Sequence, residues 1–202
     1  MIALVDIQIG NVNSVAKALK FLGINFKLVT AASEISECEK IIFPGVGSFS
    51  AASRKLEKSG LKDCIRDAVL NKKKPFLGIC LGMQLIAKSS NENGNSLGLG
   101  LIDAKIQKIP ENNHIKIPHI GWNNVVHDGL GLYDGIKENA DFYFVHSYRM
   151  VLNNKSIKCF YTDYGSKIIA YVECGNIYGT QFHPEKSQKD GIRLLKNFSE
   201  LC

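Results

Sequence analysis

A cysteine between two glycines has the setting in this sequence that most clearly suggests chemistry. Cys80 lies in Gly78-Ile79-Cys80-Leu81-Gly82, where an apolar run ends and a short helical pattern begins. A tight strand-to-helix turn holds its nucleophile in strained backbone geometry, and flanking glycines remove side chains that would collide. The thiol would also lie at a helix N-terminus, which favours the thiolate. The pattern predicts a nucleophilic elbow; the alternative is an ordinary buried cysteine.

A base and a residue to orient it follow much later in the chain. In Gln181-Phe182-His183-Pro184-Glu185, His183 is the candidate general base and Glu185 the candidate orienting carboxylate. Residues two apart on an extended segment point to the same side, so the carboxylate of Glu185 could reach the imidazole. Taken alone, His-Pro-Glu is also compatible with an ordinary loop. Together with Cys80 it predicts a Cys-His-Glu triad.

Backbone donors for an oxyanion are the third requirement of acyl transfer. Pro44-Gly45-Val46-Gly47 follows an apolar run at residues 40–43 and is a candidate for one donor. The N–H group of Leu81, directly after the nucleophile, is a candidate for the other. The carboxyl ends of parallel strands meet in one crevice, so both segments should lie beside Cys80. A simple chain turn is the alternative for the glycines.

The first half of the chain must supply the sheet that positions these segments. Short apolar runs alternate there with amphipathic patterns, a rhythm that predicts a largely parallel sheet with helices on both faces. The expected strands are residues 2–5, 25–29, 40–43 and 75–79, and the expected helices are residues 11–22, 49–58, 61–71 and a short one from residue 81.

The second half is richer in strand patterns separated by short turns, which predicts additional antiparallel strands. The expected strands are residues 101–109, 142–148, 157–161, 167–173 and 177–182. A closing helix at residues 188–201 would bury Ile192, Leu195 and Phe198 on one face, and residues 91–96 are interpreted as an exposed loop. No linker or repeat divides the chain, so we expect one α/β domain over residues 1–202.

Composition excludes several other classes of protein. With 202 residues, 45% of them hydrophobic, and no long apolar window, the chain should form one globular core without a membrane span. No secretory signal is visible, which leads us to expect a cytoplasmic location. The six cysteines are scattered, so free thiols are expected and a zinc or other metal site is not. A net charge of +6 without an arginine-rich stripe argues against nucleic-acid binding.

These motifs together resemble the class I (triad) glutamine amidotransferases. The matching segments are Gly-Ile-Cys-Leu-Gly-Met-Gln around Cys80, His-Pro-Glu at residues 183–185 and Pro-Gly-Val-Gly at residues 44–47. Residues 116–123, 142–148 and 179–188 are similar, more narrowly, to the glutaminase subunits of imidazole glycerol phosphate synthases. The resemblance covers nearly the whole chain and implies the flavodoxin-like fold of the family.

The resemblance also implies a role for individual residues. Cys80 would be the nucleophile, His183 the general base and then acid, and Glu185 the residue that orients the imidazole. The backbone N–H groups of Val46 and Leu81 would form the oxyanion hole. The positions that match the family's glutamine-binding residues are Gly47, Gln84, Ser147 and Tyr148. No cofactor is implied, because the reaction passes through a glutamyl thioester on the protein itself.

A partner is implied as well. The subunits that this chain resembles dock on a (β/α)8-barrel cyclase as a heterodimer, and their ammonia reacts there in histidine biosynthesis. The residues that match the docking face and the ammonia gate are Pro118, His119, Gly121, Trp122, Asn123, Tyr143 and Lys186. For Trp122 the alternative is a core aromatic.

One segment departs from the family pattern. Where the family usually has Asp-Tyr-Gly-x-Gly-Asn, this chain has Asp6-Ile7-Gln8-Ile9-Gly10-Asn11. The departure leaves the triad unchanged. It leaves the identity of the partner undecided, because related subunits serve synthases that amidate sugars of surface glycans. A free-standing cysteine hydrolase and a regulatory subunit without activity are further alternatives, and the complete triad argues against the second.

Overall fold

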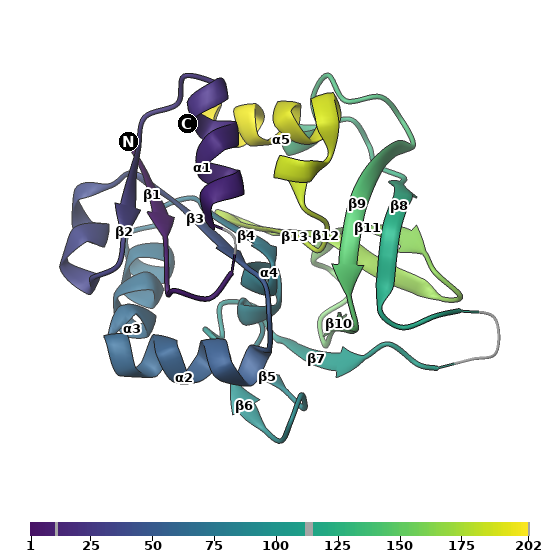
Figure 1. The fold of residues 1–202 in the computed structure, drawn as a ribbon, viewed down its shortest axis with the longest axis horizontal. Coiled ribbons are helices and arrows are strands. Elements are labelled where there is room, and N and C mark those ends of the chain that lie inside the picture. Colours follow the sequence, from purple (N-terminus) through teal and green to yellow (C-terminus); the bar gives the residue numbers. More distant parts are fainter. Residues whose placement is uncertain (11, 112–114, 202) are drawn as a thin grey trace.

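The computed structural model describes residues 1–10, 12–111 and 115–201. Its central feature is a seven-stranded sheet (Figure 1). Its order is β11-β12-β13-β4-β3-β1-β2. The parallel strands are β1 (Ile2–Val5), β2 (Phe26–Val29), β3 (Lys40–Gly45), β4 (Phe76–Cys80) and β13 (Ile177–Thr180). Two antiparallel strands, β11 (Lys158–Asp163) and β12 (Lys167–Cys174), extend one edge, as the turn-rich second half predicted.

Helices cover both faces of this sheet, because its strands are apolar on both sides. In Figure 1, α1 (Val12–Phe21) and α5 (Gln188–Glu200) lie above the sheet, and α2 (Phe49–Ser59) and α3 (Leu61–Arg66) lie below it. Alternate residues of β1 point to the two sides, so Ile2 packs with the cluster of α1 and α5 and Ala3 with the cluster of α2 and α3. The core therefore has two halves with the sheet between them.

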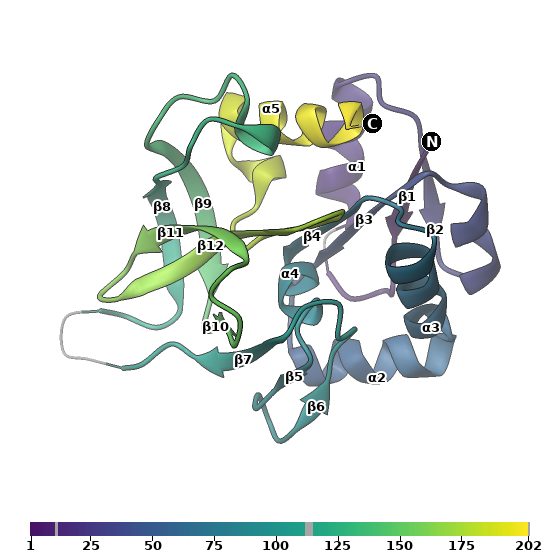
Figure 2. The ribbon, with the colours of Figure 1, turned by 180° about the vertical axis from the view of Figure 1, so that it is seen from behind.

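Smaller strand systems pack beside the central sheet. One sheet joins β10 (Tyr148–Leu152), β7 (Ala104–Lys108), β5 (Ser89–Ser90) and β6 (Ser96–Leu97) in that order. A ribbon pairs β8 (His119–Val125) with β9 (Ala140–His146), antiparallel and in register from one end to the other. Figures 1 and 2 place this ribbon at the end of the molecule away from β2. Short helical turns occupy Ala32–Glu37, Gly131–Tyr133 and Pro184–Lys186, and helix α4 (Leu81–Leu85) follows β4 directly.

The elements expected in the first half are present with small shifts at their ends. One differs in kind: the helix expected at residues 61–71 is α3 followed by a π-helical turn at Asp67–Asn71. The helix expected from residue 11 is α1, and residues 11 and 202 lie outside the described residues. In α5, Leu195 and Phe198 are fully buried as expected, whereas Ile192 is partly exposed and Leu194 lies beside them in the core.

One expectation for the second half was wrong, and one strand of the ribbon was missed. The run at residues 142–148 is not one strand, because β9 ends at His146 and Tyr148 starts β10 in a different sheet. Strand β8 was not expected, because its mixture of glycine, asparagine and aromatic residues has no clear strand period. Residues 91–96 form a loop as far as Ser96, which begins β6.

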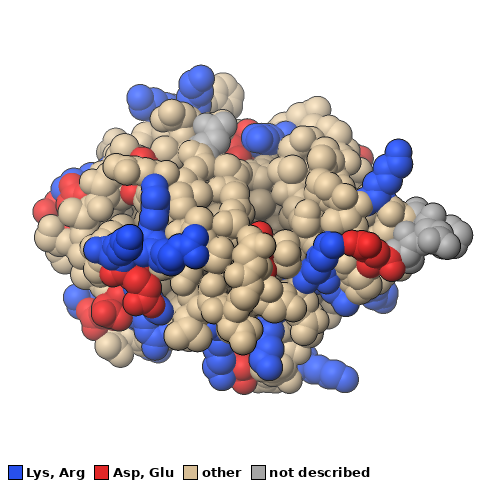
Figure 3. Space-filling model, turned by 60° about the horizontal axis from the view of Figure 1, so that its bottom comes forward, with Lys and Arg blue, Asp and Glu red and all other residues tan. Residues whose placement is uncertain are grey.

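The surface carries both signs of charge close together. On the face in Figure 3, basic side chains stand next to acidic ones, and the middle of the face carries few charges and is hollowed. Lys62 pairs with Glu57, and Lys72 pairs with Asp67 at 2.9 Å. In the described residues, no helix is both long enough and apolar enough to cross a membrane.

Candidate active site

The elbow expected at Cys80 is present. Cys80 has φ 53° and ψ −107°, a left-handed conformation that a residue with a side chain rarely adopts. A Cβ atom at Gly82 would lie 1.8 Å from the carbonyl oxygen of Phe43, and one at Gly78 would lie 2.5 Å from that of Gly82. Both glycines are therefore required so that α4 can start directly against β3 and β4.

His183 and Glu185 form a buried pair. His183 Nδ1 lies 2.8 Å from Glu185 Oε1, and each side chain is 3% exposed. The pair was expected on an extended segment, but Glu185 lies in the helical turn Pro184–Lys186, which brings its carboxylate back toward the ring. Because the carboxylate accepts from Nδ1, the other ring nitrogen of His183 is left for a reacting group.

The charge on His183 depends on its neighbours. Burial alone would lower the pKa of His183, but the adjacent Cys80 sulfur and the Glu185 carboxylate outweigh it and raise that pKa to about 10. His183 Nε2 is buried and makes no hydrogen bond of good geometry within the described residues, so the effect of Cys80 is mainly electrostatic. The imidazole therefore carries a proton at neutral pH beside a sulfur atom.

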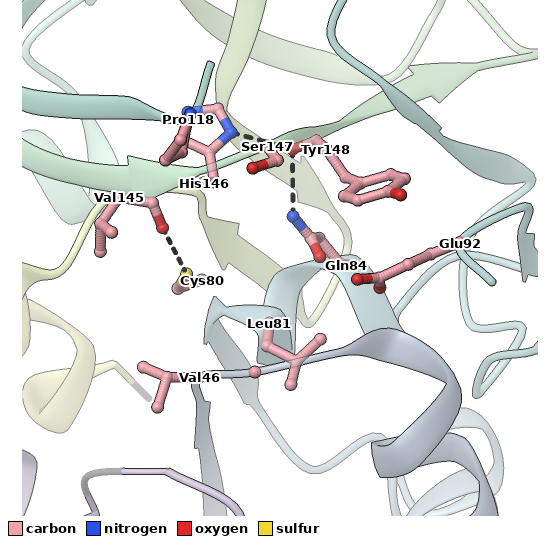
Figure 4. A pocket seen from close by; sticks show the side chains of 11 residues that line it. Val46, Cys80, Leu81, Gln84, Glu92, Pro118, Val145, His146, Ser147 and Tyr148 are labelled. Carbon is pink, nitrogen blue, oxygen red and sulfur yellow. Dashed lines mark hydrogen bonds between the residues drawn. The ribbon is translucent and has the colours of Figure 1, made fainter.

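A cavity of about 300 Å³ opens beside Cys80 (Figure 4). It collects eight of the residues that the sequence singled out: Val46, Gly47, Cys80, Leu81, Gln84, Pro118, Ser147 and Tyr148. Sequence reasoning missed the other three residues of its wall, Glu92, Val145 and His146. His183 and Glu185 do not line the cavity. The groups expected for a nucleophile, an oxyanion hole and substrate contacts thus meet at one place.

The loop after β3 lies where the oxyanion donors were expected. Gly45 is paired in register with Cys80 at the ends of β3 and β4, so Val46 and Cys80 leave the sheet at the same edge. Gly47 has φ 111°, which favours glycine. A Cβ atom at Gly10 would lie 2.6 Å from the backbone nitrogen of Val46. The backbone at Gly10 therefore lies close against that of Val46, and only glycine leaves room for this contact.

Gln84 presents a defined atom to the cavity. Its Nε2 lies 3.1 Å from the carbonyl oxygen of Tyr148 and 3.1 Å from Oε1 of Gln181. A backbone carbonyl only accepts hydrogen bonds, which fixes the orientation of the amide. Its oxygen is turned toward the side of the cavity where Glu92 lies (Figure 4).

Glu92 adds a carboxylate to this wall. Its Oε2 accepts a hydrogen bond from the N–H of Phe49 at 2.6 Å, which ties the loop after β5 to the start of α2. The sequence around Glu92 is polar and resembles any solvent loop, so only the folded chain shows that it belongs to the site. A carboxylate and the amide oxygen of Gln84 together suit an ammonium group.

The residues expected on a docking face divide into two sets. Trp122 is 49% exposed, its ring centroid lies 6.0 Å from that of Tyr143, and Lys186 Nζ lies 5.6 Å from the centroid of the Tyr143 ring. Ile120, which was not expected, is 58% exposed on the same side of β8. These four residues, Ile120, Trp122, Tyr143 and Lys186, form what we call the outer face of the ribbon.

His119, Asn123 and Pro118 lie elsewhere. The side chain of His119 is 2% exposed and is turned toward His146, so it is not part of the outer face. Asn123 donates to the carbonyl oxygen of Asp163 at 2.8 Å and so ties β8 to β11. Pro118 lines the cavity, and Gly121 supplies the φ of 138° in the middle of β8.

The sequence matches the family described as glutamine amidotransferase class-I over residues 3–201. Imidazole glycerol phosphate synthase subunit HisH 1 of Campylobacter jejuni (strain RM1221) is 43% identical over 203 residues, with 100% of each chain covered. Subunit HisH of Leptospira interrogans is 42% identical over 206 residues, and subunit HisH 2 of Pseudomonas aeruginosa is 42% identical over 202 residues, again with 100% of each chain covered.

Solved structures share the fold. A crystal structure described as a glutamine amidotransferase has a TM-score of 0.74 at 22% identity, covering 97% of this chain and 96% of that one. A structure of PurLQS from Thermotoga maritima has a TM-score of 0.73 at 18% identity, covering 98% of this chain and 96% of that one. The α/β fold class expected from the sequence is thereby confirmed.

Proposed function

This chain belongs to the class I glutamine amidotransferase family, and we propose that it is the glutaminase subunit of an imidazole glycerol phosphate synthase. It hydrolyses L-glutamine to glutamate and ammonia and supplies the ammonia to a cyclase subunit for histidine biosynthesis. The observation that carries this proposal is the convergence of a strained Cys80, a buried His183–Glu185 pair and a substrate-sized cavity. The full-length similarity to such subunits gives the pathway.

The proposed reaction uses Cys80 and His183 in two half-reactions. The Cys80 sulfur attacks the side-chain amide carbon of glutamine, and the resulting oxyanion is held by the N–H groups of Val46 and Leu81. Protonated His183 then gives its proton to the leaving nitrogen, which releases ammonia and leaves a glutamyl thioester on Cys80. The neutral imidazole next takes a proton from water, the hydroxide attacks the thioester, and glutamate leaves as the sulfur and the imidazolium are restored.

Glu185 and the wall of the cavity would position these reactants. Glu185 accepts from His183 Nδ1 and stabilises the protonated ring. In this proposal, Gln84 and Glu92 receive the α-ammonium group of glutamine. Gly47, Ser147 and Tyr148 contact the rest of the substrate in this proposal, which their position on the cavity wall supports.

The cyclase would dock on the outer face of the ribbon as the second chain of a heterodimer. An exposed Trp and Tyr next to Ile120 and a Lys match the composition of interface centres, which are rich in aromatic residues. Pro118 lines the cavity and lies two residues before Ile120 of this face, which supports a path for ammonia from Cys80 toward the (β/α)8-barrel. We include a cytoplasmic location in the proposal, because the mechanism needs Cys80 as a free thiol.

Glutamate release from glutamine tests the proposal, measured with and without the cyclase and its nucleotide ligand. We expect slow release by the chain alone, a large increase in the complex, and no release by Cys80→Ala. Cys174→Ala is the matched control, since Cys174 is an exposed free cysteine and its removal should leave the rate unchanged. Activity in Cys80→Ala would overturn the mechanism. Cys80-dependent activity that the cyclase does not increase would overturn the assignment to this synthase.

A further inference from the structure

Two buried histidines have no part in the proposed reaction: His146 lines the cavity, and His119 contacts His146. His119 is 2% exposed and His146 is 6% exposed. They face each other across the ribbon, because His119 of β8 is in register with His146 of β9. His119 Nδ1 lies 3.1 Å from His146 Nε2, which is hydrogen-bond distance.

The hydrogen-bond partners determine which nitrogens carry the protons. His146 Nδ1 lies 2.8 Å from the carbonyl oxygen of Tyr148, which can only accept, so His146 must be protonated on Nδ1. In the neutral ring Nε2 is then an acceptor, and His119 Nδ1 must be the donor to it. Burial lowers the pKa of His119 to about 4 and that of His146 to about 3, in agreement with two neutral rings.

His119 is held by its surroundings. Its ring stacks on that of Tyr164 with centroids 3.9 Å apart and on that of Phe144 with centroids 4.8 Å apart. The hydroxyl of Tyr164 donates to the carbonyl oxygen of Lys116 at 2.7 Å, which fixes the Tyr164 ring in turn. The donor that His119 offers to His146 is therefore kept in one direction.

The histidine pair is hydrogen-bonded to a backbone carbonyl group of the proposed substrate site. The carbonyl oxygen of Tyr148 accepts from His146 and also from Gln84 Nε2 at 3.1 Å, as Figure 4 shows. Gln84 Nε2 also donates a hydrogen bond to Gln181 Oε1. The Nε2 atom of Gln181 in turn lies 3.8 Å from Cys80 Sγ. A chain of hydrogen bonds thus runs from strand β8 to the amide that faces the cavity, and it continues toward the nucleophile.

We propose that His119 and His146 are positioning residues, which keep the glutamine site in its binding shape by fixing the carbonyl oxygen of Tyr148 and, through it, the amide of Gln84. This role rests on the proposed function, because it takes glutamine as the substrate. Neither histidine exchanges a proton with the substrate. Their effect is on the affinity for glutamine, whereas the reaction of Cys80 with bound glutamine proceeds with little change.

The matched variants are His146→Leu and His146→Asn. Asparagine keeps an N–H donor close to the position of Nδ1, and leucine has a similar volume without any donor. We expect His146→Leu to raise KM for glutamine about tenfold and to change kcat less than about threefold, because one buried hydrogen bond to the site is lost. His146→Asn should restore most of the affinity. His119→Phe, which keeps the ring stacking but cannot donate, should raise KM in the same direction.

Binding measurements separate this proposal from a purely structural role and from the proposed function. In the Cys80→Ala background, glutamine binding by calorimetry should weaken with His146→Leu by the same factor as KM, and thermal unfolding shows whether the variant is folded. Unchanged glutamine affinity in a folded His146→Leu chain would overturn the proposal while the wild-type chain still hydrolyses glutamine. Equal losses of glutamine affinity in His146→Leu and His146→Asn would overturn the proposal as well. A wild-type complex that releases no glutamate would instead overturn the proposed function.

Discussion

At the scale of single residues, the role proposed for Glu185 depends on one contact with His183. Their atoms are 2.8 Å apart and both side chains are buried, so water does not weaken the interaction. We expect Glu185→Gln to lower the pKa of His183 from about 10, because a neutral amide stabilises the imidazolium less than a carboxylate does. Glutamate release should fall at least about tenfold.

NMR titration of the His183 ring in wild type and Glu185→Gln measures this change directly. Glu138→Gln, an exposed acidic residue away from the site, is the control and should leave the titration of His183 unchanged. An unchanged pKa in Glu185→Gln would show that the carboxylate does not support the charge on the ring.

Gln8 shows what the departure from the family pattern means locally. It occupies a position where the family usually has glycine, yet its φ is 56°, so the left-handed backbone is kept without glycine. Its N–H donates to Asp6 Oδ1 at 2.6 Å, which supports the turn. We expect Gln8→Gly to raise the free energy of unfolding by about 0.5–1 kcal/mol, since the strain is relieved.

Urea unfolding of the two chains checks this expectation. Gln107→Gly is the control, because Gln107 lies exposed in strand β7, where glycine should lower the unfolding free energy by about 0.5–1 kcal/mol. A loss of stability in Gln8→Gly would mean that the side chain of Gln8 contributes more than its backbone strain removes.

At the scale of elements, the contact between α4 and β3 depends on the missing side chain of Gly82. A Cβ atom there would lie 1.8 Å from the carbonyl oxygen of Phe43, which belongs to the sheet and cannot move away. We expect Gly82→Ala to lower the free energy of unfolding by more than about 3 kcal/mol, measured by urea unfolding or by loss of soluble protein.

Gly23→Ala is the control, because an added Cβ at Gly23 strains the backbone without colliding with another group. Gly23 has φ 67° but has nothing within 4 Å of an added Cβ, so this variant should lose only about 1 kcal/mol. Similar losses in the two variants would mean that the helix can shift away from the strand.

The outer face of the ribbon gives a second prediction at this scale. If the cyclase docks on this face as proposed, Trp122→Ala should raise the dissociation constant of that complex at least about tenfold, because exposed aromatic residues at interface centres contribute strongly to binding. Calorimetric titration measures it, and thermal unfolding of the isolated chain should change little because Trp122 is half-exposed. Leu130→Ala, at an exposed residue outside this face, is the control.

The sequence predicted most elements of the central sheet because their apolar runs are buried on both faces and bounded by clear turns. It predicted the elbow because glycine positions report backbone geometry directly. Strand β8 was missed because its period depends on packing against β9 and not on its own residues. Glu92, His146 and the contact of His146 with His119 were missed for a similar reason, since only the fold brings these residues together at the site.

At the scale of the whole molecule, buried histidines make stability depend on pH. The pKa of His119 is lowered to about 4 and that of His146 to about 3, so the folded chain binds fewer protons than the unfolded chain below pH 6.5. Their contribution to stability is present above about pH 6.5 and is lost as the pH falls toward these values, by up to about 1.4 kcal/mol per pH unit for each ring.

Urea unfolding at pH 7 and pH 5 tests this dependence, in a range where the carboxylates remain charged. The unfolding free energy of the wild type should fall across it, and less so in a chain with both His119→Phe and His146→Asn. His183 acts in the opposite direction: its pKa is raised to about 10, so its contribution is complete below about pH 6.5 and is lost as the pH rises toward 10. Identical slopes in both chains between pH 7 and 5 would exclude the pair as the cause.

The ribbon of β8 and β9 also has a mechanical consequence, because it is a continuous two-stranded element that is fixed at one end. At one end Val125 and Ala140 are fully buried in the core, which anchors that end of the ribbon. At the other end the carbonyl oxygen of Val145 lies 3.8 Å from Cys80 Sγ, and the ring of His146 adjoins the cavity. Trp122 and Tyr143 lie halfway along. Because the two strands are paired along their whole length, we expect a force applied at the outer face to be carried along the ribbon to the end beside Cys80.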